Sequence, residues 1–354
     1  MAASSEFTVT TSTGSYDVRL GSGRLAAAAA TADVVLVDAG LVHLLPAVDV
    51  PVLTLEPSEA VKTLAGCEKV ILQMRDAGVR RGHHVLAVGG GIVQDVATFV
   101  TDVYMRGLPW TYVPTTLMAM ADSCIGGKSS INVGDVKNLV GGIYPPDAVV
   151  VDPGFLPSLG TVARNAGFAE AAKIAFCRGP ESFDGYLERH GRFDDDPVDL
   201  IDHVLRCKKW FVEIDEHDRR ERRLLNFGHT FGHALESAVD HRLTHGLAVA
   251  VGVLCAASHP ASHRDGGVER LEAHCRMLLD TAPGVGDAVS GFDVARYEHA
   301  FRSDKKHSAD AFRLILPSAG GGVAEVETGN GPDDWAVVRD VTLHILDTLT
   351  GRTA

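Results

Sequence analysis

The sequence predicts two domains: an N-terminal α/β domain with a mostly parallel sheet in residues 1–155, and a mainly α-helical domain in residues 156–354. Up to about residue 152, short apolar runs alternate with helical patterns, which is typical of a parallel sheet covered by helices. From 158 to 302, helical patterns dominate and strand patterns are sparse. A chain of 354 residues is long enough to give each domain its own core.

Composition limits the partners and the location of the protein. The net charge of −13 argues against nucleic acid as the main partner, so an anionic ligand needs a local cluster of cations. The six cysteines are scattered without a CxxC pair, which is typical of reduced thiols in a cytoplasmic protein. The N-terminus lacks the order of a signal peptide, and the most apolar segment, 246–257, is too short to span a bilayer. We therefore expect a cytoplasmic protein that binds no membrane.

The first strands are predicted from alternation and from short apolar runs. Residues 7–20 alternate around a turn at Gly14, which indicates a β-hairpin. Residues 33–38 form an apolar run that is typical of a buried strand. Asp38 ends this strand, where its carboxylate can accept hydrogen bonds from a ribose or cap the turn that follows.

The remaining elements of the first domain follow the same alternation. Further strands are expected at 51–55, 110–116 and 148–152. An amphipathic helix is expected at 60–77, with Ser58 as its N-cap.

Residues 84–100 carry the strongest local pattern of the first half: a strand runs into three glycines, and a helix begins at about Val93. The backbone of Gly89, Gly90 and Gly91 can approach a pyrophosphate closely, with helix N–H groups pointing at it. The spacing is not GxGxxG, and a triple glycine is equally common in a tight turn without a phosphate.

A second glycine-rich stretch, 122–138, contains Lys128 and Lys137 and is predicted to be a loop. Lysines in such a loop can hold phosphate or carboxylate oxygens, although an exposed basic loop has the same composition.

The second half ends with two strands and a helix. A strand pair is expected at 312–317 and 323–327, joined through three glycines, and a closing helix is expected at 333–349.

The histidine-rich segment NFGHTFGHALE is predicted to be helical, with the helix ending near Gly246. His229 and His233 are four residues apart and share one helix face, and His245 follows at the expected end of the helix. Imidazoles brought together in this way suit a divalent metal. The same spacing is also common on ordinary helix faces.

Several motifs follow one another along the chain. They are YMRG (104–107), PTTLMAMADSCIGGKSSIN (114–132), KNLVG (137–141), GFAEAAK (167–173), LLNFGHTFGHALE (224–236), THG (244–246) and DKK (304–306). Together they resemble the motifs of the 3-dehydroquinate synthase family, within the wider group of sugar-phosphate cyclases. The resemblance spans about residues 33–317.

The resemblance implies an N-terminal domain that binds NAD, a helical domain that binds a divalent metal, and an active site in the cleft. Zinc is the metal that it implies first, with cobalt as the alternative. It also implies a homodimer in which Arg106 reaches the neighbouring subunit's site. The implied metal ligands are Glu170, His229 and His245, so that His233 is assigned to the substrate rather than to the metal.

Other site positions follow from the same motif matches. Contacts to substrate phosphate and carboxylate groups are implied for Arg106, Lys128, Asn138, Lys173, Lys208, Arg222, Asn226, His233, Lys305 and Lys306. Contacts to NAD are implied for Asp38, Glu59, Lys62, Gly90, Gly91, Asp95, Thr115, Thr116, Asp122 and Lys137. The choice between Lys305 and Lys306 stays open.

The implied activity is that of a NAD- and metal-dependent carbon–oxygen lyase acting on a small sugar phosphate. A ring hydroxyl is oxidised by NAD, with the metal polarising its oxygen, and the new ketone acidifies the adjacent C–H. Phosphate is then eliminated, the hydride returns, the ring opens, and an intramolecular aldol step closes a carbocycle. The substrate phosphate itself can act as the base.

Some positions depart from the usual wording of the family. Gln94 stands where a glycine is usual, and Leu247 stands where an acidic residue is common. AEAAK replaces the more typical AEVIK, and the segment 215–223 is unusually charged. These departures suggest a divergent member.

Arg222 bears most directly on the substrate. A guanidinium suits a carboxylate, which favours a 3-deoxy-heptulosonate 7-phosphate or its amino analogue, although Arg223 beside it weakens the alignment. Sedoheptulose 7-phosphate and glucose 6-phosphate lack the carboxylate and are the alternatives, in secondary metabolism rather than aromatic amino acid biosynthesis. A rival of another class is an iron-type NAD-dependent alcohol dehydrogenase, which would release NADH.

Overall fold

The computed structural model describes residues 4–134 and 136–351, which fold into two compact units. The first unit comprises the chain up to Leu159 together with Arg192–Glu216, and the second comprises the rest. The expected division after residue 155 did not anticipate the return of Arg192–Glu216. This segment forms an amphipathic helix whose apolar face packs on the first strand of the first unit.

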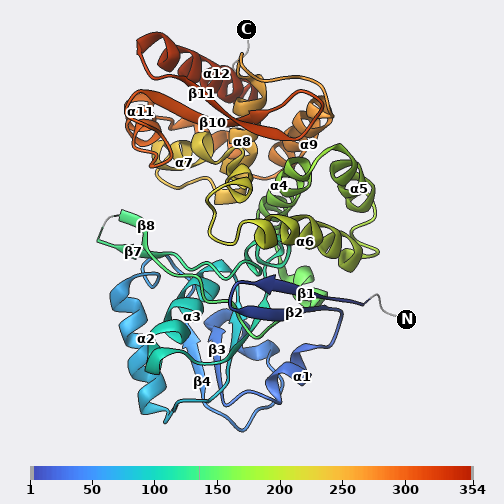
Figure 1. The fold of residues 1–354 in the computed structure, drawn as a ribbon, viewed down its shortest axis with the longest axis vertical. Coiled ribbons are helices and arrows are strands. Elements are labelled where there is room, and N and C mark those ends of the chain that lie inside the picture. The colour runs from blue at the N-terminus through green and yellow to red at the C-terminus, as the bar shows by residue number, and fades with distance from the viewer. Residues whose placement is uncertain (1–3, 135, 352–354) are drawn as a thin grey trace. The chain divides into compact units, whose positions relative to one another are not determined.

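The first unit contains a seven-stranded sheet in the order β1-β2-β9-β6-β5-β3-β4 (Figure 1). Only β1 and β2 pair antiparallel, so the mostly parallel sheet predicted from the sequence is confirmed. The strands are β1 (Ser5–Thr11), β2 (Gly14–Leu20), β3 (Val34–Asp38), β4 (Val52–Leu55), β5 (Val85–Gly89), β6 (Trp110–Pro114) and β9 (Ala148–Val151).

Helices cover this sheet because its central strands are apolar on both faces. All residues of β5 and β6 are buried. Helix α3 packs on β3, β5 and β6, and helix α6 packs on β1. The helices of the unit are α1 (Leu25–Ala29), α2 (Leu64–Asp76), α3 (Gly91–Val103) and α6 (Pro197–Ile214).

Two local features differ from the sequence-based expectations. Helix α2 begins at Leu64, because Thr63 and not Ser58 supplies the cap, its hydroxyl accepting from the Gly66 N–H at 3.1 Å. The expected loop at 122–138 contains a short hairpin, formed by β7 (Ile131–Val133) and β8 (Val136–Val140). No residue of β8 is buried, so the hairpin lacks the alternation that marks a half-buried strand.

A short π-helical segment, Ala119–Ser123, follows β6 and is called the π-turn below. Such single turns are rare and occur frequently at functional sites. Short 3-10 turns lie at Ala39–Leu44, Tyr104–Arg106, Pro153–Ser158 and Glu221–Asn226.

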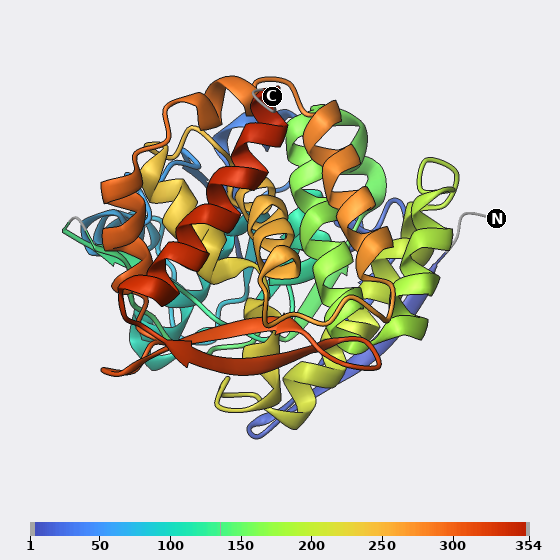
Figure 2. The same cartoon turned by 90° about the horizontal axis from the view of Figure 1, so that it is seen from above.

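The second unit is mainly helical and is built around α8 (Figure 2). Nearly every residue of α8 is buried, because α4, α7, α9 and α12 all contact it. Among the described residues, no helix combines the length and the apolar content needed to cross a membrane. The helices are α4 (Thr161–Arg178), α5 (Pro180–His190), α7 (His229–Ala238), α8 (His245–Ser258), α9 (Val268–Thr281), α10 (Val285–Ser290), α11 (Val294–Arg302) and α12 (Pro332–Thr350).

The late strand pair and the closing helix are confirmed. β10 (Ala311–Pro317) and β11 (Val323–Gly329) pair antiparallel, and α12 follows them.

The histidine-rich helix is shorter than expected. It ends at Ala238, and His245 is the first residue of a separate helix. The break occurs because Asp240 and His241 adopt left-handed conformations, with φ of 51° and 56°.

Glycines let α4, α7 and α8 approach one another closely. A Cβ added at Gly252 on α8 would lie 2.0 Å from the carbonyl oxygen of Gly228, which precedes α7. A Cβ at Gly246 would lie 2.2 Å from the carbonyl oxygen of Ala166 on α4. The three helices that carry the histidines and Glu170 therefore converge at backbone contact distance.

We expect Gly252→Ala to lower the free energy of unfolding by about 2–3 kcal/mol, because the new methyl group forces α7 and α8 apart. Gly286→Ala is the matched control: its Cβ meets only the carbonyl oxygen of Leu349 at 3.6 Å, and the change should stabilise slightly or not at all. Thermal and denaturant unfolding of both variants measure the difference. Equal effects would contradict the close helix contact.

Candidate functional site

A carboxylate and three imidazoles gather in the second unit. Glu170 lies on α4, His229 and His233 lie one turn apart on α7, and His245 starts α8. Oε1 of Glu170 is 3.6 Å from Nε2 of His229 and 3.3 Å from Nε2 of His245. The three histidines also place one nitrogen each within 4.8 Å of one another.

The spacing of Glu170, His229 and His245 suits a tetrahedral cation. Bonds of about 2.0–2.1 Å to nitrogen or oxygen at tetrahedral angles put neighbouring ligand atoms about 3.4 Å apart. The observed separations of 3.3 and 3.6 Å bracket that value. Three ligands leave a fourth position for a substrate oxygen or water.

Phe227 and Glu236 orient the imidazole rings of His229 and His245, so that Nε2 of each ring faces Glu170. Nδ1 of His229 lies 3.1 Å from the Phe227 carbonyl oxygen, so this nitrogen carries the proton and Nε2 is the free acceptor. Nδ1 of His245 lies 2.8 Å from Oε1 of Glu236. A carboxylate or carbonyl behind a histidine is the usual arrangement for fixing the tautomer of a metal ligand.

Glu170 is almost completely buried, and neither of its oxygens has a well-aligned hydrogen bond. Its charge is balanced by Lys173, whose Nζ lies 2.5 Å from Oε2, one turn along α4. Burial alone would raise the pKa of Glu170, but Lys173 and the histidines hold it well below its usual range. Lys173 pairs with Oε2, whereas Oε1 faces the Nε2 atoms of His229 and His245 and is the oxygen placed to bind a metal ion.

The pKa values of the three histidines are shifted in different directions. Burial lowers the pKa of His229 well below its usual range, so its ring is neutral and can coordinate a metal. Burial also lowers the pKa of His233, to about 4. Burial acts in the same direction on His245, but the carboxylates of Glu170 and Glu236 raise its pKa to about 10. A proton on His245 thus supplies positive charge where a divalent cation fits.

The DKK motif contributes one lysine beside this cluster. Nζ of Lys306 pairs with Oδ2 of Asp304 at 2.6 Å, and both charges act on the pKa of His233. Lys305 is exposed.

The two adjacent arginines before α7 have different environments. Arg222 is buried, with 4% of its surface exposed, whereas Arg223 pairs with Glu325 on β11 at 2.7 Å. Asn226 donates to the Arg223 carbonyl oxygen at 2.9 Å.

In the first unit, the glycine-rich turn between β5 and α3 is stabilised by packing against Val93 and by hydrogen bonds from Tyr112. A Cβ at Gly89 would lie 2.4 Å from the side chain of Val93, so this glycine is required by packing. The buried Tyr112 hydroxyl lies 3.0 Å from the carbonyl oxygen of Gly89 and 3.2 Å from that of Gly90. A Cβ at Gly91 would meet nothing within 4 Å, so the protein leaves open space where a bound phosphate can approach the backbone.

Several expected cofactor positions are linked around this turn. Lys62 pairs with Asp95 on α3 at 2.7 Å, and the Ser130 N–H donates to the same carboxylate at 2.9 Å. Asn132 donates to Glu59 at 2.8 Å. These contacts join the 59–62 segment, α3 and β7.

A second set of expected positions lies in the π-turn and in the residues between β6 and that turn. Asp122 pairs with Lys208 of α6 at 2.6 Å, and Lys208 also donates to the Asp122 carbonyl oxygen. The Thr115 N–H donates to the Gly89 carbonyl oxygen at 3.1 Å. The Thr116 hydroxyl accepts from the Ala119 N–H at 3.2 Å.

The side chains at the remaining expected positions are partly or fully exposed to solvent. Asp38 accepts a hydrogen bond from the Gly40 N–H at 2.9 Å and so caps a turn. Asn138 and its neighbour Lys137 lie on the exposed strand β8, and the backbone of Asn138 is left-handed, with φ of 54°. Lys128 is half-buried. Arg106 is exposed, with φ of 69°.

Sequence reasoning assigned no role to Glu236, Tyr112 and Gln94, which hydrogen-bond to site elements. Glu236 lies two turns after His229 on the same helix face, which is a signal that the spacing contained. Gln94 was visible as a departure from the family's usual glycine, whereas Tyr112 offered no local signal.

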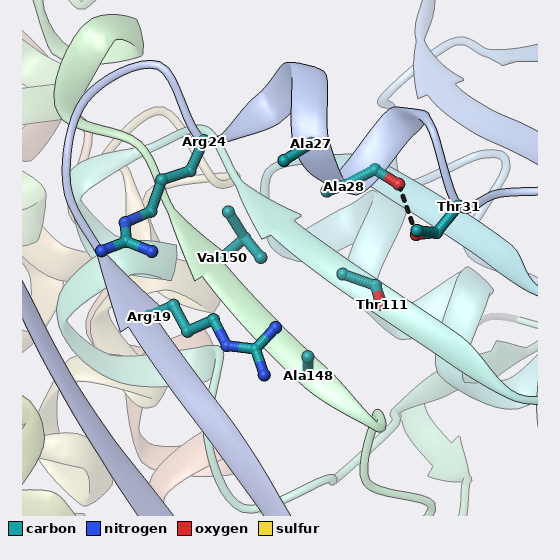
Figure 3. Close-up of a pocket in the computed structure, with 8 residues that line it drawn as sticks. All are labelled: Arg19, Arg24, Ala27, Ala28, Thr31, Thr111, Ala148 and Val150. Carbon is teal, nitrogen blue, oxygen red and sulfur yellow. Dashed lines mark hydrogen bonds between the residues drawn. The ribbon is translucent and has the colours of Figure 1, made fainter.

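A cavity of about 190 Å³ in the first unit is lined by residues of α1 and strands β2, β6 and β9 and by Arg24 and Thr31, none of which is an expected site residue (Figure 3). Arg19 and Arg24 line it, and Arg19 pairs with Glu6 and Asp17.

Known families match most of the chain. The family description "3-dehydroquinate synthase N-terminal" matches residues 52–165, and "3-dehydroquinate synthase C-terminal" matches residues 167–307. A 3-dehydroquinate synthase of Halorhodospira halophila is 36% identical over 277 residues, covering 77% of each chain.

Solved structures share the fold over nearly the whole chain. The 2-epi-5-epi-valiolone synthase ValA of Streptomyces hygroscopicus subsp. jinggangensis, with NAD+ and Zn2+ bound, is 25% identical, with a TM-score of 0.78 and coverage of 96% of this chain and 97% of that one. A 2-deoxy-scyllo-inosose synthase complexed with carbaglucose-6-phosphate, NAD+ and Co2+ is 22% identical, with a TM-score of 0.76 and coverage of 96% and 99%. The matched sequence motifs, the two family descriptions and the relative at 36% identity show that the chain belongs to the 3-dehydroquinate synthase family.

Proposed function

We propose that this protein converts a 3-deoxy-heptulosonate 7-phosphate, or its amino analogue, into a carbocycle with loss of phosphate. As a member of its family it is a NAD- and metal-dependent phosphate-eliminating cyclase, a carbon–oxygen lyase.

The cluster of Glu170, His229 and His245 is the observation that carries the proposal, and we assign these three residues as ligands of a zinc or cobalt ion. His233 lies close enough to be an alternative ligand. We assign it to the substrate instead, because the unsatisfied oxygens belong to Glu170 and the Nε2 atoms of His229 and His245 face them.

We further propose that the first unit is the NAD domain and the second the metal domain. Bound NAD supplies a hydride acceptor, and the metal polarises the substrate oxygen that is oxidised. Tyr112 keeps the glycine carbonyls occupied, so that the backbone N–H groups at the start of α3 can face a pyrophosphate. Two ion pairs, Lys62 with Asp95 and Lys208 with Asp122, fix further side chains that we assign to the NAD and substrate sites.

The chain's cations bind and orient the substrate. Lys173 and Lys306 lie in the second unit beside the Glu170 and His233 side chains, where they can neutralise phosphate or carboxylate oxygens in a net-acidic protein. Lys306, and not the exposed Lys305, is the member of the DKK motif that we assign to the substrate.

Arg222 supports the acid substrate. Arg222 is the more deeply buried of the two adjacent arginines, and Arg223 pairs with Glu325, so we assign the carboxylate contact to Arg222. A buried guanidinium favours a carboxylate partner, because fork-like pairing in a low-dielectric site is strong. Sedoheptulose 7-phosphate and glucose 6-phosphate have no carboxylate, so they are the weaker candidates.

A homodimer is the proposed assembly, with Arg106 serving the neighbouring subunit's site. Met105 and Arg106 both have left-handed backbone, with φ of 50° and 69°, which presents Arg106 outward at a conformational cost. Val103 and Met105 beside it are 45% and 41% exposed, as expected for residues that a partner covers.

Incubation of the purified protein with NAD, Zn2+ or Co2+ and each sugar phosphate tests the activity. We expect one inorganic phosphate to be released per carbocycle formed from the 3-deoxy-heptulosonate 7-phosphate, without accumulation of NADH. Chelation should abolish turnover. Stoichiometric NADH production would instead indicate a dehydrogenase, and phosphate release from a neutral sugar phosphate alone would overturn the acid substrate.

Substitution of the arginines tests which one binds the carboxylate. Arg222→Met should lower kcat/KM for the acid substrate about 100-fold, because a buried charge-assisted pair is lost, while Arg223→Met should change it less than about threefold. Circular dichroism and thermal unfolding check that both variants fold. Similar losses from both would contradict the assignment.

Glu236→Gln tests the partner behind His245. The change removes the negative charge that orients and polarises this ring, so zinc affinity should fall about 10- to 100-fold. Competition with a chromophoric chelator gives the dissociation constant, and the visible spectrum of the Co2+ form reports ligand geometry. Glu298→Gln, which breaks a surface pair with Arg302, is the control and should change neither.

A further inference from the structure

Gln94 is a buried polar residue on α3 that no motif role explains. Only 5% of its surface is exposed, and its backbone N–H donates to the Gly90 carbonyl oxygen at 3.0 Å. It therefore belongs to the first turn after the glycine-rich turn, beside the start of the helix where the pyrophosphate is proposed to bind.

The side-chain amide of Gln94 makes two hydrogen bonds to one residue of the π-turn. Nε2 donates to the Ser123 carbonyl oxygen at 2.7 Å, and Oε1 accepts from the Ser123 hydroxyl at 2.5 Å. A carbonyl oxygen can only accept, so Nε2 must face it, and the orientation of the amide is determined. Only a side chain with a donor and an acceptor at this reach can make both contacts.

These contacts satisfy the end of the π-turn. The last carbonyl groups of a helical segment lack partners within it, and Gln94 supplies one for Ser123. Asp122, the preceding residue, is held by Lys208 through both its carbonyl oxygen and its carboxylate. Gln94 and Lys208 thus fix neighbouring residues of the same turn, from α3 and from α6.

We propose that Gln94 is a positioning residue that holds the Asp122–Lys208 pair in place relative to the glycine-rich turn, so that NAD affinity depends on its amide. It acts through Ser123 and Asp122 rather than by contact with the cofactor. The inference rests on the proposed placement of NAD at Gly90, Gly91 and Asp122.

Calorimetric titration with NAD tests the inference in the full-length protein. Gln94→Leu keeps the volume but removes both hydrogen bonds, and the NAD dissociation constant should rise about tenfold. Ser123→Ala removes only the hydroxyl and should raise it about threefold. Thr101→Val is the matched control on α3: it removes a buried hydroxyl bonded only within the helix, to Ala97 at 2.7 Å, and should leave NAD affinity unchanged.

A double-mutant cycle with Asp122→Asn separates positioning from packing. If Gln94 acts through Asp122, the Asp122→Asn effect on NAD affinity should be several-fold smaller in the Gln94→Leu background. Effects that multiply, or a Gln94→Leu variant that loses thermal stability but keeps its NAD affinity, would overturn the inference. A wild-type protein that does not bind NAD would instead refute the proposed function itself.

If Asp122→Asn weakens NAD binding and Gln94→Leu does not, only the proposed positioning role of Gln94 is contradicted.

Discussion

The buried carboxylate of Glu170 is the constraint on which the second unit depends. A charge in a protein interior must be paired, and this one is surrounded by Lys173, His229 and His245 with no well-aligned hydrogen bond of its own. A divalent cation at the same place satisfies the carboxylate and both imidazoles together. If these groups bind the ion as proposed, stability and metal binding are linked, because the groups are costly to bury without it.

Backbone contacts bring these groups together. Glu170, His229 and His245, the proposed metal ligands, come from three helices, and their separations are set by how closely those helices pack. Gly228, Gly246 and Gly252 remove the side chains that would hold the helices apart. The buried, apolar α8 then serves as a rigid support, which is the property that a precise ligand geometry requires.

A layer of supporting residues lies behind the groups expected to contact ligands in each unit. Glu236 stands behind His245, Tyr112 behind the glycine-rich turn, and Gln94 behind the π-turn. None of them appears in the ligand-contacting set that the motifs imply. Their hydrogen bonds orient the groups in front of them, so substitutions there should alter affinity more than chemistry.

The sequence alone determined the two-part architecture, most strands and helices, and the family, because apolar periodicity, glycine turns and ordered motifs are local properties. It also identified Glu170, His229 and His245 as candidates through the family resemblance, whereas spacing alone favoured the pair His229 and His233. Only the tertiary structure decided that the histidine-rich segment is two helices, that α6 joins the first unit, and that Arg222 is buried whereas Arg223 pairs with Glu325. Those outcomes depend on contacts between residues far apart in the chain, such as Arg223 with Glu325 and Gln94 with Ser123, which no local pattern encodes.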